Sequence, residues 1–337
     1  MKIRQGICIA MLALAPAVSA SAACKIAQLA EWPVKHAYNR PLIEGKINGH
    51  PVVVLVDTGA SSTFMWRWAA EQLGMSLGWV QGLRVFGVGG EARVAGTMIK
   101  ELQLGAYTAK NVQLAALGDE KAPHDTALVL GDEFFSSFST EFDIQHGVIR
   151  LLRPEGCKAD QLAYWSTTYS LAELQPMRIE NPKIHLDILL NGKHVGAMLD
   201  TGAPTSMLAL GVAERAGFKP DADAATPASA VQGVAEKRVE SWVATFDTVS
   251  IGDETVRNVR LRVSDMFGKA TMTETGSRIA HPAGDLPEML LGFDFLISHR
   301  VLVLPKEHAV VFTYNGGPLF QYVEPVAHPA APAANAP

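Results

Sequence analysis

The chain has 337 residues, of which 48% are hydrophobic and 19% are charged, and its net charge is −5 at pH 7. This composition excludes an intrinsically disordered protein, which would have too little apolar surface to bury. The small negative net charge does not indicate the basic surface that proteins use to bind nucleic acid. The length allows one large domain or two lobes of roughly 150 residues each.

The first residues have the pattern of a secretory signal. Lys2 and Arg4 precede an apolar run at residues 7–18, which is too short to span a bilayer comfortably. The small residues that follow fit a signal-peptidase cleavage site. We therefore predict a signal peptide at residues 1–23 and a periplasmic or secreted protein, with an uncleaved anchor as the alternative. No later apolar stretch predicts an integral membrane span in the mature chain.

Two cysteines remain once Cys8 leaves with the signal, namely Cys24 and Cys157. An even pair in an exported protein indicates a disulfide, here between the new N-terminus and the end of the first half of the chain. The alternative is lipidation of Cys24, although a lipidation box normally carries a larger aliphatic residue where Ser21 stands. At the other end, residues 324–337 are rich in Pro and Ala and predict a disordered tail.

The middle of the chain is an internal repeat. Residues 48–75 align without a gap on residues 191–218, a constant offset of 143 positions. Both blocks begin with Asn-Gly, contain Asp-Thr-Gly-Ala and end with Ala-Glu-x-x-Gly. The similarity continues downstream to Leu-Gly elements near the end of each unit. We therefore predict two equivalent lobes, at residues 24–163 and 164–323.

The local signals within each unit are mostly β. The Asn-Gly pairs predict hairpin turns, and residues 52–56 predict a buried strand. Apolar residues at helical spacing predict one short helix at 65–73 and another at 207–216, each ending at a Gly. Many short strands with Gly turns favour barrel-like or sandwich-like lobes.

One acid follows an apolar strand in each unit, Asp57 in the first and Asp200 in the second. A carboxylate there is costly to bury unless its lone pairs find donors. The following Gly permits a tight turn whose backbone N–H points at the carboxylate, and the Thr hydroxyl can lock the loop to its partner lobe. Two such loops meeting across a pseudo-two-fold axis would make the carboxylates share a proton. One would then act as base for a water and the other as acid for a carbonyl oxygen.

On these residues the chain resembles the pepsin/retropepsin superfamily of aspartic proteases. In that family the Leu-Gly element crosses behind the catalytic loop and braces it. The resemblance implies a mainly β, bilobal acid-protease fold with one or more short helices per lobe, an extended polypeptide as substrate, and no cofactor or metal. Because both halves lie in one chain, it also implies a monomer. The residues that carry it are Asp57, Thr58, Gly59, Ala60, Asp200, Thr201, Gly202 and Ala203, supported by Leu130, Gly131, Leu291 and Gly292.

The resemblance also implies a flap that closes over the substrate. Phe86, Gly87, Val88, Gly89 and Gly90 look like a retroviral-type flap, in which glycines allow the opening motion. Flap backbone groups would bind the substrate chain as an added strand. The second copy, at 231–234, has fewer glycines and is expected to be stiffer. The chain thus resembles a fused, single-chain version of a retropepsin dimer.

Two departures from the pepsin pattern have consequences. Phe86 stands where pepsins have a Tyr at the first flap, and Ala60 and Ala203 stand where they usually have Ser or Thr. One hydrogen bond fewer to each carboxylate should raise the pKa values of the coupled pair. We therefore expect activity at mildly acidic pH.

Other interpretations were weighed against an exported aspartic endopeptidase. Residues 87–92 fit the dinucleotide fingerprint G-x-G-x-x-A, but 93–97 do not continue as the helix it requires. The histidines have no metal-ligand spacing, and no G-x-S-x-G nucleophile elbow occurs. A narrow processing protease remains an alternative, as does a catalytically silent scaffold that binds peptides or assists assembly.

Overall fold

A computed structural model of the chain describes residues 24–79, 85–88, 90–118, 125–158, 161–175, 183–220, 226–231, 238–267, 271–273, 280–282 and 286–321. The predicted signal peptide at 1–23 and the predicted tail at 324–337 lie outside these residues. So do Gly89 of the first flap and positions 232–234 of the second.

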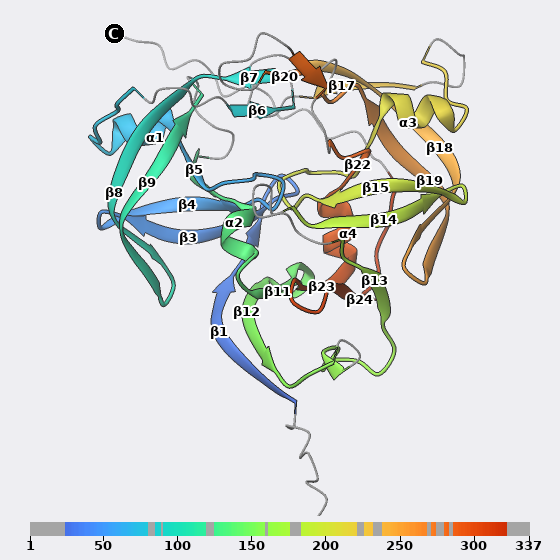
Figure 1. Cartoon of the computed structure of the whole chain (residues 1–337), viewed down its shortest axis with the longest axis horizontal. Coiled ribbons are helices and arrows are strands. Elements are labelled where there is room, and N and C mark those ends of the chain that lie inside the picture. The colour runs from blue at the N-terminus through green and yellow to red at the C-terminus, as the bar shows by residue number, and fades with distance from the viewer. Residues whose placement is uncertain are drawn as a thin grey trace, which may run out of the picture.

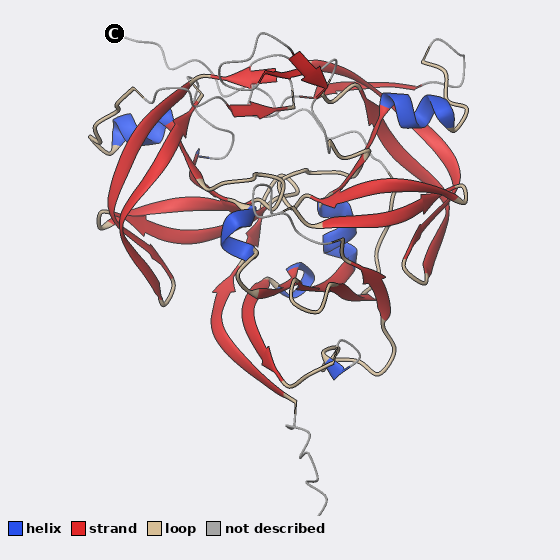
Figure 2. Cartoon of the chain, in the orientation of Figure 1, coloured by secondary structure: helices blue, strands red, loops and turns tan. Residues whose placement is uncertain are grey.

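The described residues form two similar lobes and a sheet that joins them. Figure 1 shows the lobes side by side, with the joining sheet below them and the short strands β6, β7 and β17 above. Figure 2 shows that strands dominate and that the helices are short. The prediction of a mainly β, bilobal fold is confirmed. No helix in the described part of the chain is long and apolar enough to cross a membrane.

The first lobe is built on a seven-stranded sheet in the order β2-β3-β4-β10-β5-β9-β8. Strand β10 lies at its centre, parallel to β4 and antiparallel to β5. Helix α1 follows β5, and a separate hairpin is formed by β6 and β7. The bounds are β2 (Lys35–His36), β3 (Pro41–Ile47), β4 (His50–Val56), β5 (Phe64–Trp66), α1 (Arg67–Gln72), β6 (Val85–Gly87), β7 (Gly90–Ala92), β8 (Val94–Leu104), β9 (Tyr107–Leu117) and β10 (Thr126–Leu130).

The second lobe repeats this plan in the order β14-β15-β22-β16-β19-β18-β17. Its central strand β22 is parallel to β15 and antiparallel to β16. The bounds are β14 (His185–Leu190), β15 (Lys193–Leu199), β16 (Met207–Ala209), α3 (Leu210–Arg215), β17 (Thr226–Val231), β18 (Val239–Ile251), β19 (Glu254–Ser264), β22 (Met289–Leu291) and the separate hairpin of β20 (Thr271–Thr273) and β21 (Ala280–Pro282).

The same local device makes the first hairpin of each lobe. Asn48 and Asn191 have φ of 51° and 49°, and the glycines that follow have φ of 84° and 75°. Two consecutive left-handed residues form the turn whose twist matches antiparallel strands. The side chain Oδ1 of Asn48 accepts the Lys100 amide at 2.9 Å, and that of Asn191 accepts the Thr248 amide at 3.0 Å. Each turn therefore also fastens its hairpin to the neighbouring strand.

The predicted helices start later than the sequence indicated. Residues 65–66 and 207–209 belong to strands β5 and β16, because Met65 pairs with the central strand β10, and Met207 and Leu208 pair with the central strand β22. Helical spacing cannot show a sheet pairing with a strand about 60 to 80 residues away, so tertiary contacts override it here. The helices themselves, α1 and α3, occupy the rest of each predicted segment.

The joining sheet takes three strands from each half of the chain, in the order β1-β12-β11-β23-β24-β13. Its middle pair, β11 and β23, is antiparallel and crosses between the halves. Short helices α2 and α4 and a 3₁₀ turn lead into it. The bounds are β1 (Lys25–Pro33), α2 (Asp132–Phe135), β11 (Ser139–Asp143), a 3₁₀ helix (Ile144–His146), β12 (Val148–Glu155), β13 (Ser170–Glu173), α4 (Phe293–Ser298), β23 (His299–Leu304) and β24 (Ala309–Tyr314).

A buried carboxylate holds the two halves together within this sheet. The Glu141 side chain is fully buried and accepts hydrogen bonds from Arg150 of the first half, at 2.5 Å, and Arg300 of the second, at 2.9 Å. The Tyr164 hydroxyl donates to its second oxygen. A buried charge with these partners is satisfied, whereas removing one partner would leave an uncompensated charge.

A disulfide joins Cys24 to Cys157, which are 133 positions apart. It lies where β1 begins and β12 ends, next to the pair Lys25 and Glu155. The bond therefore fastens the first described residue to the far end of the first half.

Candidate active site

The two acids begin the loops that follow the inner strands of the lobes. Asp57 comes directly after β4, and its amide donates to the Leu130 carbonyl at 3.0 Å. Asp200 comes directly after β15, and its amide donates to the Leu291 carbonyl at 2.9 Å. The central strands β10 and β22 therefore hold each acid at the end of a parallel pair.

The residues after each acid fold back onto its carboxyl group. Asp57 Oδ1 accepts the amides of Gly59 at 2.9 Å and Ala60 at 3.1 Å. In the second lobe Asp200 Oδ1 accepts the amides of Gly202 and Ala203, both at 3.0 Å. Each carboxyl is thus fixed through one oxygen by its own loop, as the turn chemistry predicted.

The two loops are joined by their threonines. The Thr58 hydroxyl donates to the Leu199 carbonyl at 2.7 Å, and the Thr201 hydroxyl donates to the Val56 carbonyl at 2.7 Å. Each hydroxyl also accepts the other threonine's amide, at 3.0 and 3.1 Å. Both threonines are completely buried. These four hydrogen bonds all cross between the lobes.

The joined loops bring the carboxyls together. A Cβ on Gly59 would overlap the carboxyl of Asp200, and a Cβ on Gly202 would overlap that of Asp57. Each carboxyl therefore lies against the glycine of the opposite loop. Burial, and then the negative charge of Asp57, raises the pKa of Asp200 to about 7, while Lys183 acts in the opposite direction. Near neutral pH this arrangement retains one proton at the pair.

The bracing elements support each loop from behind. The amide after Gly131, that of Asp132, donates to the Ala60 carbonyl at 2.8 Å. The amide after Gly292 donates to the Ala203 carbonyl at 2.9 Å. A Cβ on Gly131 or on Gly292 would overlap the backbone of the acid-bearing loop in its lobe. Both positions therefore need glycine for a close backbone approach.

The hairpin predicted to be the first flap reaches the second lobe. It is the hairpin of β6 and β7, in which Gly87 pairs with Gly90. Val88 at its tip packs against an apolar cluster of the second lobe, and Val231 at the end of β17 packs against the same cluster. That cluster contains Met198, Ala203, Met207, Met266 and Leu290. A matching first-lobe cluster contains Phe64, Leu117 and Val129, with Ala60 and Val85 packed against it.

Sequence reasoning missed two cations beside the loops. Arg40 Nε donates to the Gly202 carbonyl at 2.9 Å, and Lys183 Nζ donates to the Gly59 carbonyl. The signal was present in the sequence, because these two residues are also 143 positions apart and so occupy the same place in the repeat. The two positions precede the Asn-Gly turns, where the clear similarity between the repeats begins, by eight residues.

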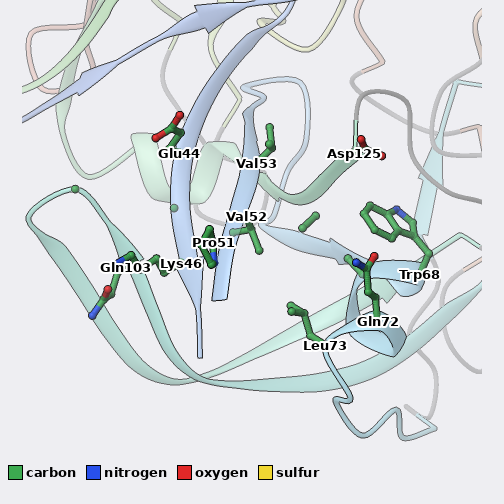
Figure 3. Close-up of a pocket in the computed structure, with 14 residues that line it drawn as sticks. Glu44, Lys46, Pro51, Val52, Val53, Trp68, Gln72, Leu73, Gln103 and Asp125 are labelled. Carbon is green, nitrogen blue, oxygen red and sulfur yellow. The ribbon is translucent and has the colours of Figure 1, made fainter. Parts of the chain in front are cut away.

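A pocket of about 820 Å³ lies elsewhere in the first lobe (Figure 3). Figure 3 shows Trp68 and Gln72 of α1, with Leu73 directly after the helix, on one side and residues of β3 and β4 on the other. None of its lining residues belongs to the two acid loops. The described residues contain no group of three or more His, Cys, Asp or Glu side chains placed to hold a metal ion.

Comparison with known proteins gives one family and a similar solved structure. The aspartyl protease family matches residues 43–134 and 186–295, so each stretch contains one Asp-Thr-Gly and one bracing glycine. Among solved structures, a retropepsin-like aspartic protease from Rickettsia conorii is similar at 17% identity, with a TM-score of 0.29, over 39% of this chain and 94% of that chain. No curated protein matches the chain.

The threonine hydrogen bonds predict a large loss of stability when one hydroxyl is removed. Thr201→Val keeps the shape but leaves the Val56 carbonyl and the Thr58 amide without their partner. Each buried group left unsatisfied costs about 1–3 kcal/mol. Thr201→Ser keeps the hydroxyl and is the matched control. Urea denaturation should show a strongly lowered midpoint for the valine variant and a small change for serine. Equal midpoints for the two variants would contradict a stabilising role for the hydroxyl.

Proposed function

Because the chain belongs to the aspartyl protease family, which matches it in two tandem retropepsin-like repeats, we propose that it is an exported endopeptidase with Asp57 and Asp200 as its catalytic pair. The observation that carries the proposal is the joining of the two Asp-Thr-Gly loops. Their threonines exchange hydrogen bonds, and each acid lies against the opposite glycine. This arrangement needs both lobes and leaves the two carboxyls facing one space.

The chemistry follows from one shared proton. One carboxylate takes a proton from a water, whose oxygen attacks the peptide carbonyl carbon, while the other carboxyl gives its proton to the carbonyl oxygen. The resulting diol collapses when the acid that took the water proton gives it to the amide nitrogen, the C–N bond breaks, and one diol hydroxyl gives its proton to the other carboxylate. The two acids end the cycle with one proton between them again. No covalent intermediate with the protein forms.

The substrate proposed is an extended polypeptide with apolar side chains next to the cleaved bond. The support is the pair of apolar clusters that flank the acids, one containing Phe64 and the other Met207. The first flap offers strand edges above the same space. A chain laid between the flap and the loops could pair with that edge as an added strand.

Export is proposed on two features. The first residues have the secretory pattern described above, and a disulfide joins Cys24 to Cys157. Disulfides persist in oxidising compartments such as the periplasm or the exterior. A disulfide and a lipid on Cys24 exclude each other, because both consume the same sulfur.

The mass of the exported chain tests this proposal. Expressed with its leader, the protein should be recovered outside the cytoplasm, cleaved just before Cys24 or a few residues earlier. Its intact mass should lie two hydrogens below that of the same chain after reduction. An added lipid mass, which Cys24→Ser would remove, would establish the lipid-anchored alternative. Retention of the leader would contradict cleavage.

Substitution of each acid tests the proposed activity. The mature protein should cleave peptides from a denatured proteome, read by mass spectrometry from about pH 3 to 8. Asp57→Asn and Asp200→Asn should each lose essentially all cleavage, because either change removes a proton-transfer group worth roughly 10²–10⁴-fold. Asp187→Asn is the matched control, since this exposed acid of β14 pairs with His194 far along the strand from the loops.

The outcomes separate the alternatives. Loss in both dyad variants with activity in the control supports one shared site. Cleavage by either dyad variant would contradict it. A wild type that binds peptides at every pH without cleaving them would favour the silent scaffold, and cleavage of one dedicated protein only would favour the narrow processing protease.

The pH dependence follows from the raised pKa of Asp200. Catalysis needs its proton, so activity should be present at mildly acidic pH and fall as pH rises through about 7. Ala203→Ser adds a hydroxyl beside the carboxylate, which favours the charged form and lowers the pKa of Asp200. The alkaline limb of the pH–rate profile should therefore move to lower pH. Ala209→Ser adds the same hydroxyl outside the loop and should leave the limb in place. If the alkaline limb does not move in either variant, the decline in activity at high pH is not due to deprotonation of Asp200.

A further inference from the structure

Two cations occupy equivalent positions in the lobes, and each crosses to the opposite catalytic loop. Lys183 of the second lobe donates to the Gly59 carbonyl, while Arg40 of the first lobe donates to the Gly202 carbonyl at 2.9 Å. The amides of the same two glycines donate to the carboxyls of Asp57 and Asp200. One glycine thus separates each cation from one acid of the pair.

The surroundings of the two cations differ. Lys183 is 6% exposed, whereas Arg40 is only partly buried. In the first lobe the bracing Gly131 is followed by Asp132, and in the second lobe Gly292 is followed by Phe293. Burial lowers the pKa of Lys183, opposed by the negative charges of Asp57, Asp132, Asp200 and Glu133, in that order of strength. Burial also lowers the pKa of Arg40, and among the described groups only the negative charges of Asp57 and Asp200 oppose this lowering.

Asp132 does not neutralise Lys183 at mildly acidic pH. Its side chain is completely buried, no side chain among the described residues hydrogen-bonds to its carboxyl oxygens, and the backbone of Ile184 is the one hydrogen-bonding group that favours its charged form. Burial raises the pKa of Asp132 to about 8, although Lys183 acts in the opposite direction. The carboxyl is therefore protonated where the enzyme is proposed to work. The ammonium charge of Lys183 is then directed at the catalytic pair, and first of all at Asp57.

We propose that Lys183 is a positioning residue that fixes the Gly59 carbonyl and biases the pair toward one state, with the negative charge on Asp57 and the proton on Asp200. This deepens the proposed function by assigning the two roles. Asp57 takes the proton from the attacking water, and Asp200 gives its proton to the peptide carbonyl oxygen. Arg40 does not oppose this bias, because its charge also acts on Asp57 before Asp200.

The test follows the ionisation of the carboxyls directly. The mature protein is labelled with ¹³C at the Asp carboxyl carbons, and the Asp200 signal is assigned with Asp200→Asn. Lys183→Gln removes the charge, Lys183→Arg keeps it, and Arg40→Gln removes the equivalent cation of the other lobe. An opposite charge at close range lowers a carboxyl pKa by roughly one unit or more. Lys183→Gln should therefore move the Asp200 titration up by about one pH unit, Lys183→Arg should restore most of it, and Arg40→Gln should move it less.

The pH dependence of kcat and KM is a second, independent measurement. In Lys183→Gln the alkaline limb of the pH profile of kcat should move together with the Asp200 titration. KM should change little, because the ammonium group of Lys183 binds the loop and not the substrate. A residue that only stabilised the fold would lower the amount of active enzyme without moving either pH dependence.

Asp132→Asn keeps the proposal falsifiable if Lys183→Gln does not fold. Since Asp132 is neutral below pH 7, this change should leave the Asp200 titration in place there. A titration moved to lower pH would mean that Asp132 is charged and cancels Lys183, which would overturn the proposal. Equal shifts in Lys183→Gln and Arg40→Gln, or no shift in either, would overturn it as well.

The carboxyl titration needs no turnover, so the two proposals can fail separately. If the wild type does not cleave peptides but Lys183→Gln still shifts the Asp200 titration, the proposed function is wrong and the proposed charge bias is supported. If the wild type cleaves peptides but Lys183→Gln does not shift the Asp200 titration, the proposed function is supported and the charge bias is wrong.

Discussion

The buried exchange of hydrogen bonds between Thr58 and Thr201 is the constraint on which the site depends. Each hydroxyl donates to the strand before the opposite acid and accepts the opposite threonine's amide. Neither loop can satisfy these groups within its own lobe. The carboxyls therefore take up their facing positions only when the lobes dock, and a docked interface is a precondition for any chemistry between Asp57 and Asp200.

The rest of the scaffold makes that docking persist. Strands β11 and β23 pair across the halves, and the buried Glu141 takes arginines from both. Helices α2 and α4 start directly after the bracing glycines, which pack against the acid-bearing loops, so only a few residues link the joining sheet to these loops. One hydrophobic core, with Phe142 of β11 and Phe312 of β24 among its fully buried members, runs through the same region. The loops thus rest on rigid elements rather than on flexible connections.

The sequence was informative where the chemistry is local. The Asn-Gly turns, the acids after apolar strands and the close-packed glycines each follow from the needs of one short segment. The pairing of β11 with β23 could not be predicted from one short segment. Alternation of apolar residues shows which face of a strand is buried, but not which strand it pairs with. For the same reason residues 65–66 and 207–209 had a helical pattern and became strands. Lys183 and Asp132 were missed because a lone Lys and an acid after a Gly look like solvated surface until their burial is known.

Duplication within one chain allows the two halves of the site to differ. In a dimer of identical chains both loops would face the same side chains, and neither acid would be distinguished by the protein. Here the equivalent positions have diverged to Arg40 and Lys183, and to Phe293 and Asp132. The threonines, the glycines and the acids themselves have not. The residues that must be symmetric to join the loops are therefore kept, while those around them set unequal charges at the two carboxyls. An enzyme that needs one acid and one base from a chemically identical pair gains from that inequality, since the proton then has a preferred place before substrate arrives.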